Sequence, residues 1–428
     1  MIAAVALVAA AAPARAQSVQ GQLLDEVTGA PVEGALALLL DTDGEQVAGY
    51  LTNDQGRFLL RAPGPGRFTV RVERIGYRTV ESDPFQLSQS QIFGLRLQTG
   101  QSAVELEGIR VEGEQQCVVR PAEGLLISQV WEEARKALTV QEWTEAERTF
   151  RFTLENYERI LDPTSLRVRD ETRRVREGVA ESPVRSLPVD ELLTQGFIQS
   201  IEGGGYSYYG PDASVLLSDP FLDTHCFRLR ADEDHPDLLG LGFEPARPHE
   251  TPDIHGTLWL DQETSELEHL EYRYTWSPWQ EAIGVAGGRG GFQKMPSGAW
   301  IIRRWRIRMP IMAQEGGAMF DRPSRIRLES IKEVGGIVTR TAHMNREVIS
   351  EAETGLLSGF VWDSTRYSPL VGAQVYLSGT GYAATTDSAG AFVLDRLSEG
   401  TFTAVFTHPR LDTLAWSDDR RALGTFHD

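Results

Sequence analysis

A nine-residue pattern occurs near both ends of this chain and constrains its fold more than any other feature. Thr52–Leu60 reads TNDQGRFLL, and Thr386–Leu394 reads TDSAGAFVL. The flanking spacing agrees as well, because Gly21–Pro31 and Gly359–Pro369 both span a ten-residue step from glycine to proline. Two modules built on one template therefore lie at the two ends of the chain.

Each part of the repeated pattern has a physical reason. Asn53 and Asp387 are each followed three residues later by glycine, which is the chemistry of hairpin turns. Phe58 and Phe392 come next, where we expect a side chain that points into a core. Short strands at intervals of about ten residues, separated by glycine and proline, predict an antiparallel β-sandwich.

This pattern resembles the carboxypeptidase regulatory-like domain over residues 18–100 and 355–428. The resemblance implies a seven-stranded, transthyretin-like sandwich of the carbohydrate-binding-like group, which serves as a non-catalytic accessory module. The tail VELEGIRVEG at 104–113 is similar to the connector that precedes the plug of TonB-dependent receptors. The second copy has fewer residues after its last glycine, so its final strand is incomplete or the natural chain continues past Asp428.

The first residues predict export. MIAAVALVAAAAPARA has an apolar run that is too short to span a bilayer, which takes about 20 residues. An Ala-x-Ala step follows that run, as in a secretory signal cleaved after Ala16. We therefore expect a signal peptide at 1–16 and a location in the periplasm, at the outer membrane or on the surface of a Gram-negative-type cell.

Charge and cysteine content narrow the possible partners. A formal net charge of −19 disfavours nucleic acid, because phosphate binding needs a basic surface. Cys117 and Cys226 are the only cysteines, and in an oxidising compartment they predict a disulfide. Two separately buried thiols are the alternative.

The region at 114–346 predicts an α+β domain with a large curved antiparallel sheet. Residues 122–138 have apolar side chains at helical spacing, and Trp131 beside that stripe is expected in the core. Another helix is expected near 215–225. Alternating strands follow, in which WRIRMP directs arginines outward and SRIRLES directs Ile326 and Leu328 inward. GVAGGRGGF, at 284–292, predicts a flexible hairpin loop.

The strand-turn-strand GTLWLDQETSEL at 256–267 is similar to a hairpin of the periplasmic lipoprotein-carrier fold. That resemblance implies a half-barrel whose concave face holds an acyl chain or another apolar guest. The alternative is that the tryptophans and tyrosines of this region simply fill a core.

The sequence contains no recognisable catalytic motif. None of the eight histidines has glutamate three residues later, and Gly-x-Ser-x-Gly is missing, so we expect no metallopeptidase, hydrolase or metal site. We also expect no cofactor. A glycine-rich loop carries Tyr206, Tyr208 and Tyr209, which form a candidate ligand-contacting surface, with strand termination as the alternative.

The overall fold class predicted is mainly β, with two seven-stranded-type sandwiches flanking the α+β domain. The function expected is an exported, non-catalytic binding or scaffold protein of the cell envelope, whose partner is a glycan, peptide or protein. One alternative is a periplasmic carrier of a lipid or lipoprotein acyl chain. Another is an accessory region of a longer carboxypeptidase or TonB-dependent receptor-type protein.

Overall fold

The computed structural model of the chain describes residues 17–101, 118–119, 126–148, 150–179, 186–202, 204–231, 235–247, 251–279, 282, 284–315, 325–344, 348–351, 355–363, 366–377, 382–397, 402–412 and 425–426. The proposed export signal at 1–16, the connector at 104–113 and Cys117 lie outside these residues. The described part is mainly β, as the sequence predicted. The chain divides into two compact units, residues 1–108 with 263–266 and 296–299, and the remainder.

The N-terminal module consists of two sheets. One contains β4 (Arg57–Arg61), β1 (Ser18–Asp25) and β8 (Ile92–Thr99) in that order, and the other contains β3 (Gln46–Leu51), β2 (Leu36–Leu40), β5 (Gly66–Glu73) and β6 (Val80–Glu81), with β7 (Phe85–Leu87) also paired to β5. Most pairs are antiparallel, but β1 and β8 run parallel over eight residue pairs, from Ser18↔Ile92 to Asp25↔Thr99. The antiparallel prediction was therefore wrong for this one pair, because its strands are the first and last of the module and no hairpin joins them.

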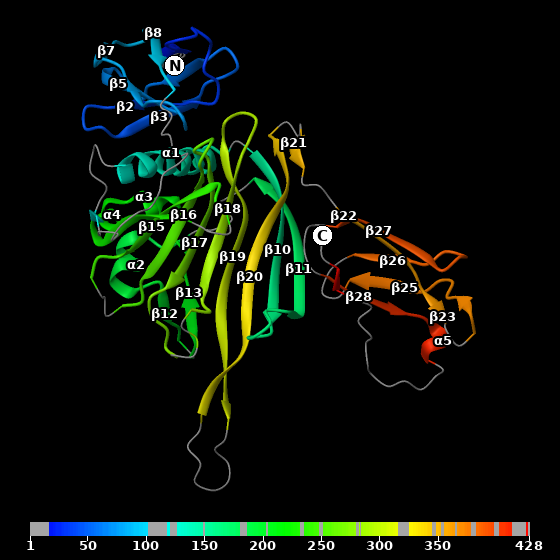
Figure 1. Ribbon diagram of the computed structural model, residues 1–428. Helices are drawn as coiled ribbons and strands as arrows, with labels where there is room; N and C mark the ends of the chain where they lie inside the picture. Colours follow the sequence, from blue (N-terminus) through cyan, green and yellow to red (C-terminus); the bar gives the residue numbers. More distant parts are fainter. Residues whose placement is uncertain are drawn as a thin grey trace, which may run out of the picture. The chain divides into compact units, whose positions relative to one another are not determined.

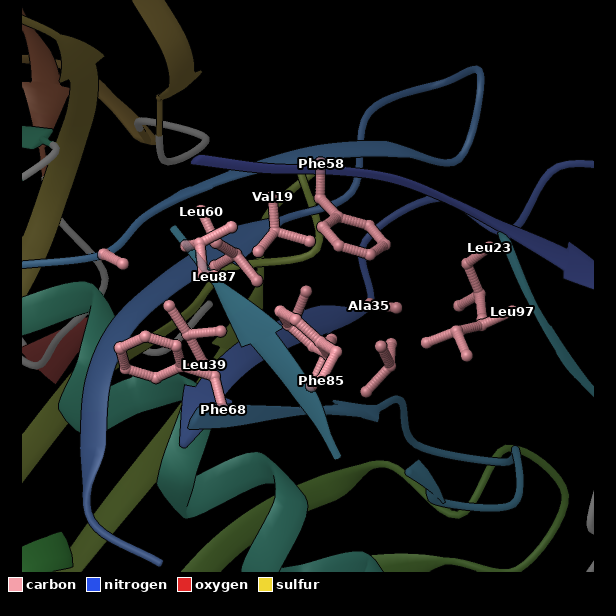
Figure 2. Packing of buried hydrophobic residues seen from close by; sticks show 14 of the residues in the cluster. Val19, Leu23, Ala35, Leu39, Phe58, Leu60, Phe68, Phe85, Leu87 and Leu97 are labelled. Carbon is pink, nitrogen blue, oxygen red and sulfur yellow. The ribbon is translucent and has the colours of Figure 1, made fainter. Parts of the chain in front are cut away.

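The core of the N-terminal module lies between its two sheets (Figure 2). Phe58 from β4 and Phe68 from β5 are both buried and contribute to one cluster with Leu39 and Leu87. Val19 and Leu60 have no exposed surface at all. The inward direction predicted for Phe58 is confirmed.

A buried threonine closes the turn before β4. The Thr52 hydroxyl donates to the carbonyl oxygen of Val32 at 2.7 Å and accepts from the backbone N–H of Ala35 at 2.9 Å. Gly56 has φ +67, and a Cβ there would collide with the carbonyl of Leu23. The motif thus uses threonine for its hydroxyl and glycine for its missing side chain.

The same contacts recur near the C-terminus. The Thr386 hydroxyl donates to the carbonyl oxygen of Leu370 at 2.6 Å and accepts from the N–H of Ala373 at 2.8 Å. Phe392 is buried in a separate apolar cluster. The elements of this region are β22 (Gly355–Phe360), β23 (Trp362–Asp363), β24 (Ser368–Pro369), β25 (Gln374–Leu377), β26 (Ala383–Thr385), β27 (Ala391–Leu397), β28 (Phe402–Thr407), α5 (Pro409–Asp412) and β29 (Thr425–Phe426).

A large antiparallel sheet forms the central region (Figure 1). Its ten-strand path is β11 (Val168–Val179), β10 (Phe150–Leu161), β20 (Arg325–His343), β19 (Trp300–Glu315), β18 (Gly287–Lys294), β17 (Leu267–Tyr274), β16 (Ile254–Asp261), β15 (Leu238–Pro245), β14 (His225–Ala231) and β9 (Val118–Val119), and β21 (Val348–Glu351) also pairs with β20. A separate two-stranded sheet contains β12 (Ile198–Ser200) and β13 (Tyr206–Tyr208). The long hairpin of β19 and β20 extends past its neighbours.

Helices cover one face of this sheet. They are α1 (Leu126–Ala146), α2 (Val189–Gln195), α3 (Ala213–Leu217) and α4 (Asp219–Thr224). The helix predicted at 122–138 therefore continues to Ala146, and its Trp131 is buried with its ring centroid 5.6 Å from that of Phe227. Two short helices replace the single helix expected near 215–225. The side chains of Asp212 and Ser218 each accept a backbone N–H bond at the N-terminus of one of these helices, α3 and α4 respectively. The first helix therefore ends and the second begins at Ser218.

Two local predictions were wrong. Gly287–Lys294 is a strand between β17 and β19 and not a flexible loop. Its glycines allow close packing, since a Cβ at Gly288 would collide with the Tyr272 ring. Ile326 is 49% exposed and does not point into a core. No helix in the described residues has the length and apolar character needed to cross a membrane.

Candidate ligand-binding site

The central sheet has two chemically different faces. Leu270, Tyr272 and Tyr274 of β17 are buried, and Leu270 and Tyr272 contact the space below α1 and α3, so we call this side the helix face. The alternate residues on the opposite side include many cations, and we call that side the arginine face. Its members are Arg230 of β14, His255 of β16, Glu271 and Arg273 of β17, Arg289 of β18, and Arg306 and Arg308 of β19.

The helix face is filled by side chains. A void of about 30 Å³ lies between α1, α3 and strands β17–β19, where Leu138, Leu216 and Trp305 are among the lining residues. That volume suits one or two water molecules, whereas ligand pockets measure about 300–1,000 Å³. This void has no room for an acyl chain, and the apolar guest implied by the lipoprotein-carrier resemblance stays a prediction.

A much larger cavity, of about 470 Å³, lies on the arginine face. The turn between β10 and β11 lines it with Pro163, Thr164 and Leu166, and the strands supply its floor. Five arginines and one glutamate line it, which gives a formal charge of +4 with His255 neutral. This positive site belongs to a chain whose net charge is −19.

Strand register explains why the arginines gather. Arg273 of β17 lies opposite Gly287 of β18, which lies opposite Arg308 of β19. The adjacent row on the same face places Arg289 between Glu271 and Arg306. Side chains two residues apart along a strand share a face, so both rows point into one space.

Some of these cations already have partners. Arg289 pairs with Glu271 at 2.9 Å, and Arg308 pairs with Glu333 at 2.7 Å. Arg273 donates to the carbonyl oxygen of Gly284. By contrast, the side chains of Arg230, His255 and Arg306 have no hydrogen bond or ion pair in the described part of the chain.

The surroundings of the three unpartnered groups disfavour their charged forms. Burial lowers the pKa of His255, and the nearby Arg230 and Arg273 lower it further. Burial also lowers the pKa of Arg306, with a second contribution from Arg308, while the nearby charge of Glu333 offsets part of this shift. For Arg230, burial and then Arg228 act in the same direction on the pKa. Both causes would be relieved by a negative charge among these side chains.

The Arg230 side chain lies against Gly242 of β15, where the backbone has no side chain. A Cβ at Gly242 of β15 would collide with the Nε and Cδ atoms of Arg230. Gly242 lies between Arg228 of β14 and Thr257 of β16, and Thr257 lines the cavity. The missing side chain at Gly242 therefore lets the Arg230 side chain lie flat across β15, toward β16.

A second network fixes the far side of the cavity. Arg308 shares Glu333 with Arg159, whose Nη1 lies 3.4 Å from a Glu333 oxygen. Arg159 also bonds Glu171 at 2.8 Å, and Arg173 bonds Glu155 at 2.6 Å and also pairs with Glu171. This network links β11, β10, β20 and β19, and its carboxylates are buried. It holds Arg308 in place at the cavity.

The rim is shaped by Asp162. Its carboxylate accepts the backbone N–H groups of Thr164 and Ser165 and an N–H of Arg169. These bonds, with that from Ser165 the largest contribution, lower the pKa of Asp162 well below its usual range. The turn that carries Thr164 and Leu166 is therefore set by local hydrogen bonds.

The predicted tyrosine surface lies elsewhere in the central region. Tyr206 packs edge-on against Trp279, and Tyr208 packs edge-on against Tyr274. Burial raises the pKa of Tyr208 to about 12. The carbonyl of Tyr209 accepts the hydroxyl of Tyr274 at 3.0 Å. All three tyrosines are half-buried and none lines the arginine-lined cavity, so their ligand role stays a prediction.

Cys226 is the one predicted disulfide partner that the structure describes. It is buried on β14 and lies opposite Val119 of β9. Cys117, two residues before Val119, is outside the described residues. The disulfide therefore stays a prediction. Among the described residues, no group of acidic, histidine or cysteine side chains is arranged to hold a metal ion.

Sequence reasoning missed the arginine-lined cavity. Arg306 and Arg308 were expected to point outward into solvent, yet both are half-buried and line the cavity. The available signal was the strict alternation of arginine in RRWRIR, combined with Arg289 inside a run of glycines. Arginine side chains that lie beside small residues on neighbouring strands can gather in one cavity.

The N-terminal module has two packed β-sheets, and comparison with known families assigns this module to a class. Residues 18–99 match the family model of the carboxypeptidase regulatory-like domain, which is a regulatory and non-catalytic type of domain. That match confirms the N-terminal resemblance and covers about a fifth of the chain. It does not extend to 355–428. No curated protein matches the chain.

Several solved structures are similar to parts of the chain. The 5-hydroxyisourate hydrolase of Klebsiella pneumoniae is 22% identical, covering 20% of this chain and 98% of its own, with a TM-score of 0.17. BcpA, the major pilin subunit of Bacillus cereus, is 8% identical over 91% of this chain and 87% of its own, with a TM-score of 0.18. A candidate carbohydrate-binding protein from Bacteroides uniformis is 12% identical over 54% of this chain and 90% of its own, with a TM-score of 0.17. TM-scores this low carry no argument about function.

Proposed function

We propose that this chain is an exported, non-catalytic binding protein of the cell envelope. Its central domain binds a ligand, glycan or peptide in character, in the arginine-lined cavity, and the β-sandwich modules act as spacers or docking units. One observation carries the proposal: a cavity of about 470 Å³ whose lining includes five arginines, of which Arg230 and Arg306 have no side-chain partner among the described residues.

We also propose that residues 355–428 are a second copy of the N-terminal module. The support is the recurrence of the threonine contacts, since Thr52 and Thr386 each bridge a carbonyl oxygen and an N–H at matching positions. The turn glycines Gly56 and Gly390 also both have positive φ, at +67 and +75. Local sequence and local geometry thus agree in the two regions.

Export is tested by expressing the full chain in a Gram-negative host, fractionating the cells and sequencing the N-terminus of the product. We expect the protein outside the cytoplasm, with Gln17 as its first residue. A product that keeps residues 1–16 and stays in the cytoplasm contradicts export.

Binding is tested by screening the purified protein against glycan and peptide arrays. Thr164→Trp adds bulk at the exposed rim of the cavity without changing charge, and we expect it to abolish the hits. Gln195→Trp is a matched control, because Gln195 is exposed and does not line the cavity. Hits that survive Thr164→Trp unchanged would place the binding surface elsewhere. A screen without any saturable hit would contradict a glycan or peptide ligand.

A further inference from the structure

The positive charge of the cavity is unusual for this chain. The whole sequence has 61 acidic and 42 basic residues, but the cavity lining has one acidic residue and five arginines. Glu271 pairs with Arg289 and Glu333 pairs with Arg308, but the side chains of Arg230 and Arg306 have no ion pair among the described residues. Such a concentration of one sign of charge in a hollow attracts ligands of the opposite sign.

The three side chains without a partner are also partly removed from water. Arg230, His255 and Arg306 are all half-buried. Burying a charged group without a partner is unfavourable, so the folded chain retains a strain that an anion would relieve. The pKa values of the same three groups are lowered by burial and by neighbouring arginines.

The position of these groups indicates more than one anionic group in the ligand. His255 is on β16 and Arg306 is on β19, which are three strand steps apart. At about 4.8 Å a step their backbones lie about 14 Å apart. Arg230 approaches the His255 end across Gly242. A single carboxylate cannot bridge both ends of the cavity, whereas a molecule with two or more negative groups can.

The size and the lining limit the ligand further. A volume of about 470 Å³ is typical of a small-molecule site. Tyr272 is the only aromatic ring other than His255 in the lining, and it is buried in the helix face, so no open ring offers a stacking platform. Recognition would then depend on arginine, whose guanidinium group binds phosphate and carboxylate through two parallel hydrogen bonds.

We propose that the arginine-lined cavity binds a compact polyanion, a small molecule that carries at least two phosphate or carboxylate groups. The inference rests on the proposed binding function and names the chemistry of its ligand. Arg306 holds one anionic group at the β19 end, and Arg230 with His255 holds another at the β16 end. Arg308 and Arg289 keep their glutamate partners and shape the floor.

The test is isothermal titration calorimetry on the full chain with three probes. Pyrophosphate and citrate present phosphate and carboxylate groups respectively, and glycerol is the neutral control. We expect saturable binding of at least one polyanion, no binding of glycerol, and weaker binding at 200 mM than at 50 mM NaCl because salt screens the charges. Binding of pyrophosphate alone or citrate alone assigns the anionic group.

Variants locate the site. We expect Arg306→Gln and Arg230→Gln each to raise the Kd about tenfold or more, and the double variant to bind neither probe detectably. Arg304→Gln makes the same charge change on the same strand and face, but Arg304 is exposed and outside the cavity lining. We expect Arg304→Gln to bind within about twofold of the wild type. Circular dichroism confirms that each variant is folded.

Two results would overturn the proposal. One is a folded wild type that binds neither polyanion, and the other is an equal loss of affinity in Arg304→Gln and Arg306→Gln, which would indicate diffuse charge attraction. The binding function can survive either result. A neutral array hit that is lost in Thr164→Trp but kept in Arg306→Gln would show a working cavity with a different ligand class.

Discussion

The hydroxyl of Thr52 offers a quantitative test of how the repeated motif stabilises a module. Thr52 is 2% exposed, and its Oγ1 is the hydrogen-bond partner of both the Val32 carbonyl and the Ala35 N–H. Thr52→Val keeps the shape of the side chain and removes both bonds. Leaving a buried donor or acceptor unpaired costs about 1–3 kcal/mol for each group.

We therefore expect Thr52→Val to lower the free energy of unfolding of the N-terminal module by about 2–4 kcal/mol. The gain from the extra buried methyl offsets part of the loss. A module of 60–100 residues loses about 4–8 °C in Tm per kcal/mol, so the shift is large. Thr52→Ser is the matched control, because it keeps the hydroxyl and removes only a methyl group.

The assay is differential scanning calorimetry of the full chain, combined with hydrogen exchange followed by mass spectrometry. Exchange should accelerate in peptides from residues 18–99 and stay unchanged in the central sheet. Thr386→Val should produce the converse pattern, with faster exchange confined to the C-terminal region. If Thr52→Val is as stable as Thr52→Ser, the two bonds contribute little and the reasoning about the motif is wrong.

Three further predictions concern the central domain. Glu333→Gln should lower the free energy of unfolding by about 3–5 kcal/mol in urea titrations, because it removes the buried carboxylate that pairs with both Arg308 and Arg159. Glu158→Gln, at an exposed carboxylate that pairs with Lys332, should lower the free energy of unfolding by less than about 1 kcal/mol. Equal losses in the two variants would contradict the expected difference between a buried and an exposed carboxylate. The pKa of His255, followed by NMR, should lie below 6.5 and rise when a polyanion binds. A His255 pKa below 6.5 means that the unfolded chain binds more protons than the folded chain near that pH. The free energy of unfolding should therefore fall as the pH drops through about 6.5, and His255→Asn should reduce that fall. A His255 pKa above 6.5 in the folded protein would contradict this prediction. Peptide mapping without reductant should recover Cys117 and Cys226 as one linked species, whereas two alkylated thiols contradict the disulfide.

The N-terminal module was predictable because its information is local. Thr52, Asn53 and Gly56 each act within a few residues of the turn, so the sequence pattern directly reports the geometry. The inward direction of Phe58 likewise follows from the two-residue alternation of the strand that begins after that turn. The one parallel pair, β1 with β8, was missed because no short-range signal connects strands that are so distant in sequence.

The arginine-lined cavity was not predictable in the same way. It depends on the register between strands, and register is a property of the whole sheet. Gly287 and Gly288 looked like a loop because glycine weakens strands, yet the adjacent strands require small residues there. Arg306 looked like an ordinary solvent-facing residue because half of a typical antiparallel sheet does face water. Only the turn at Pro163 and Thr164, from another part of the chain, makes that face a cavity.

The parallel pairing of β1 and β8 has a mechanical consequence. The chain enters this pair at Ser18 and leaves it at Thr99, at opposite ends of the two strands. Tension applied to the two ends of the module would therefore pull the strands past each other lengthwise. The whole row of backbone bonds would carry that load together, instead of opening one at a time, which suits a part that must transmit force without unravelling.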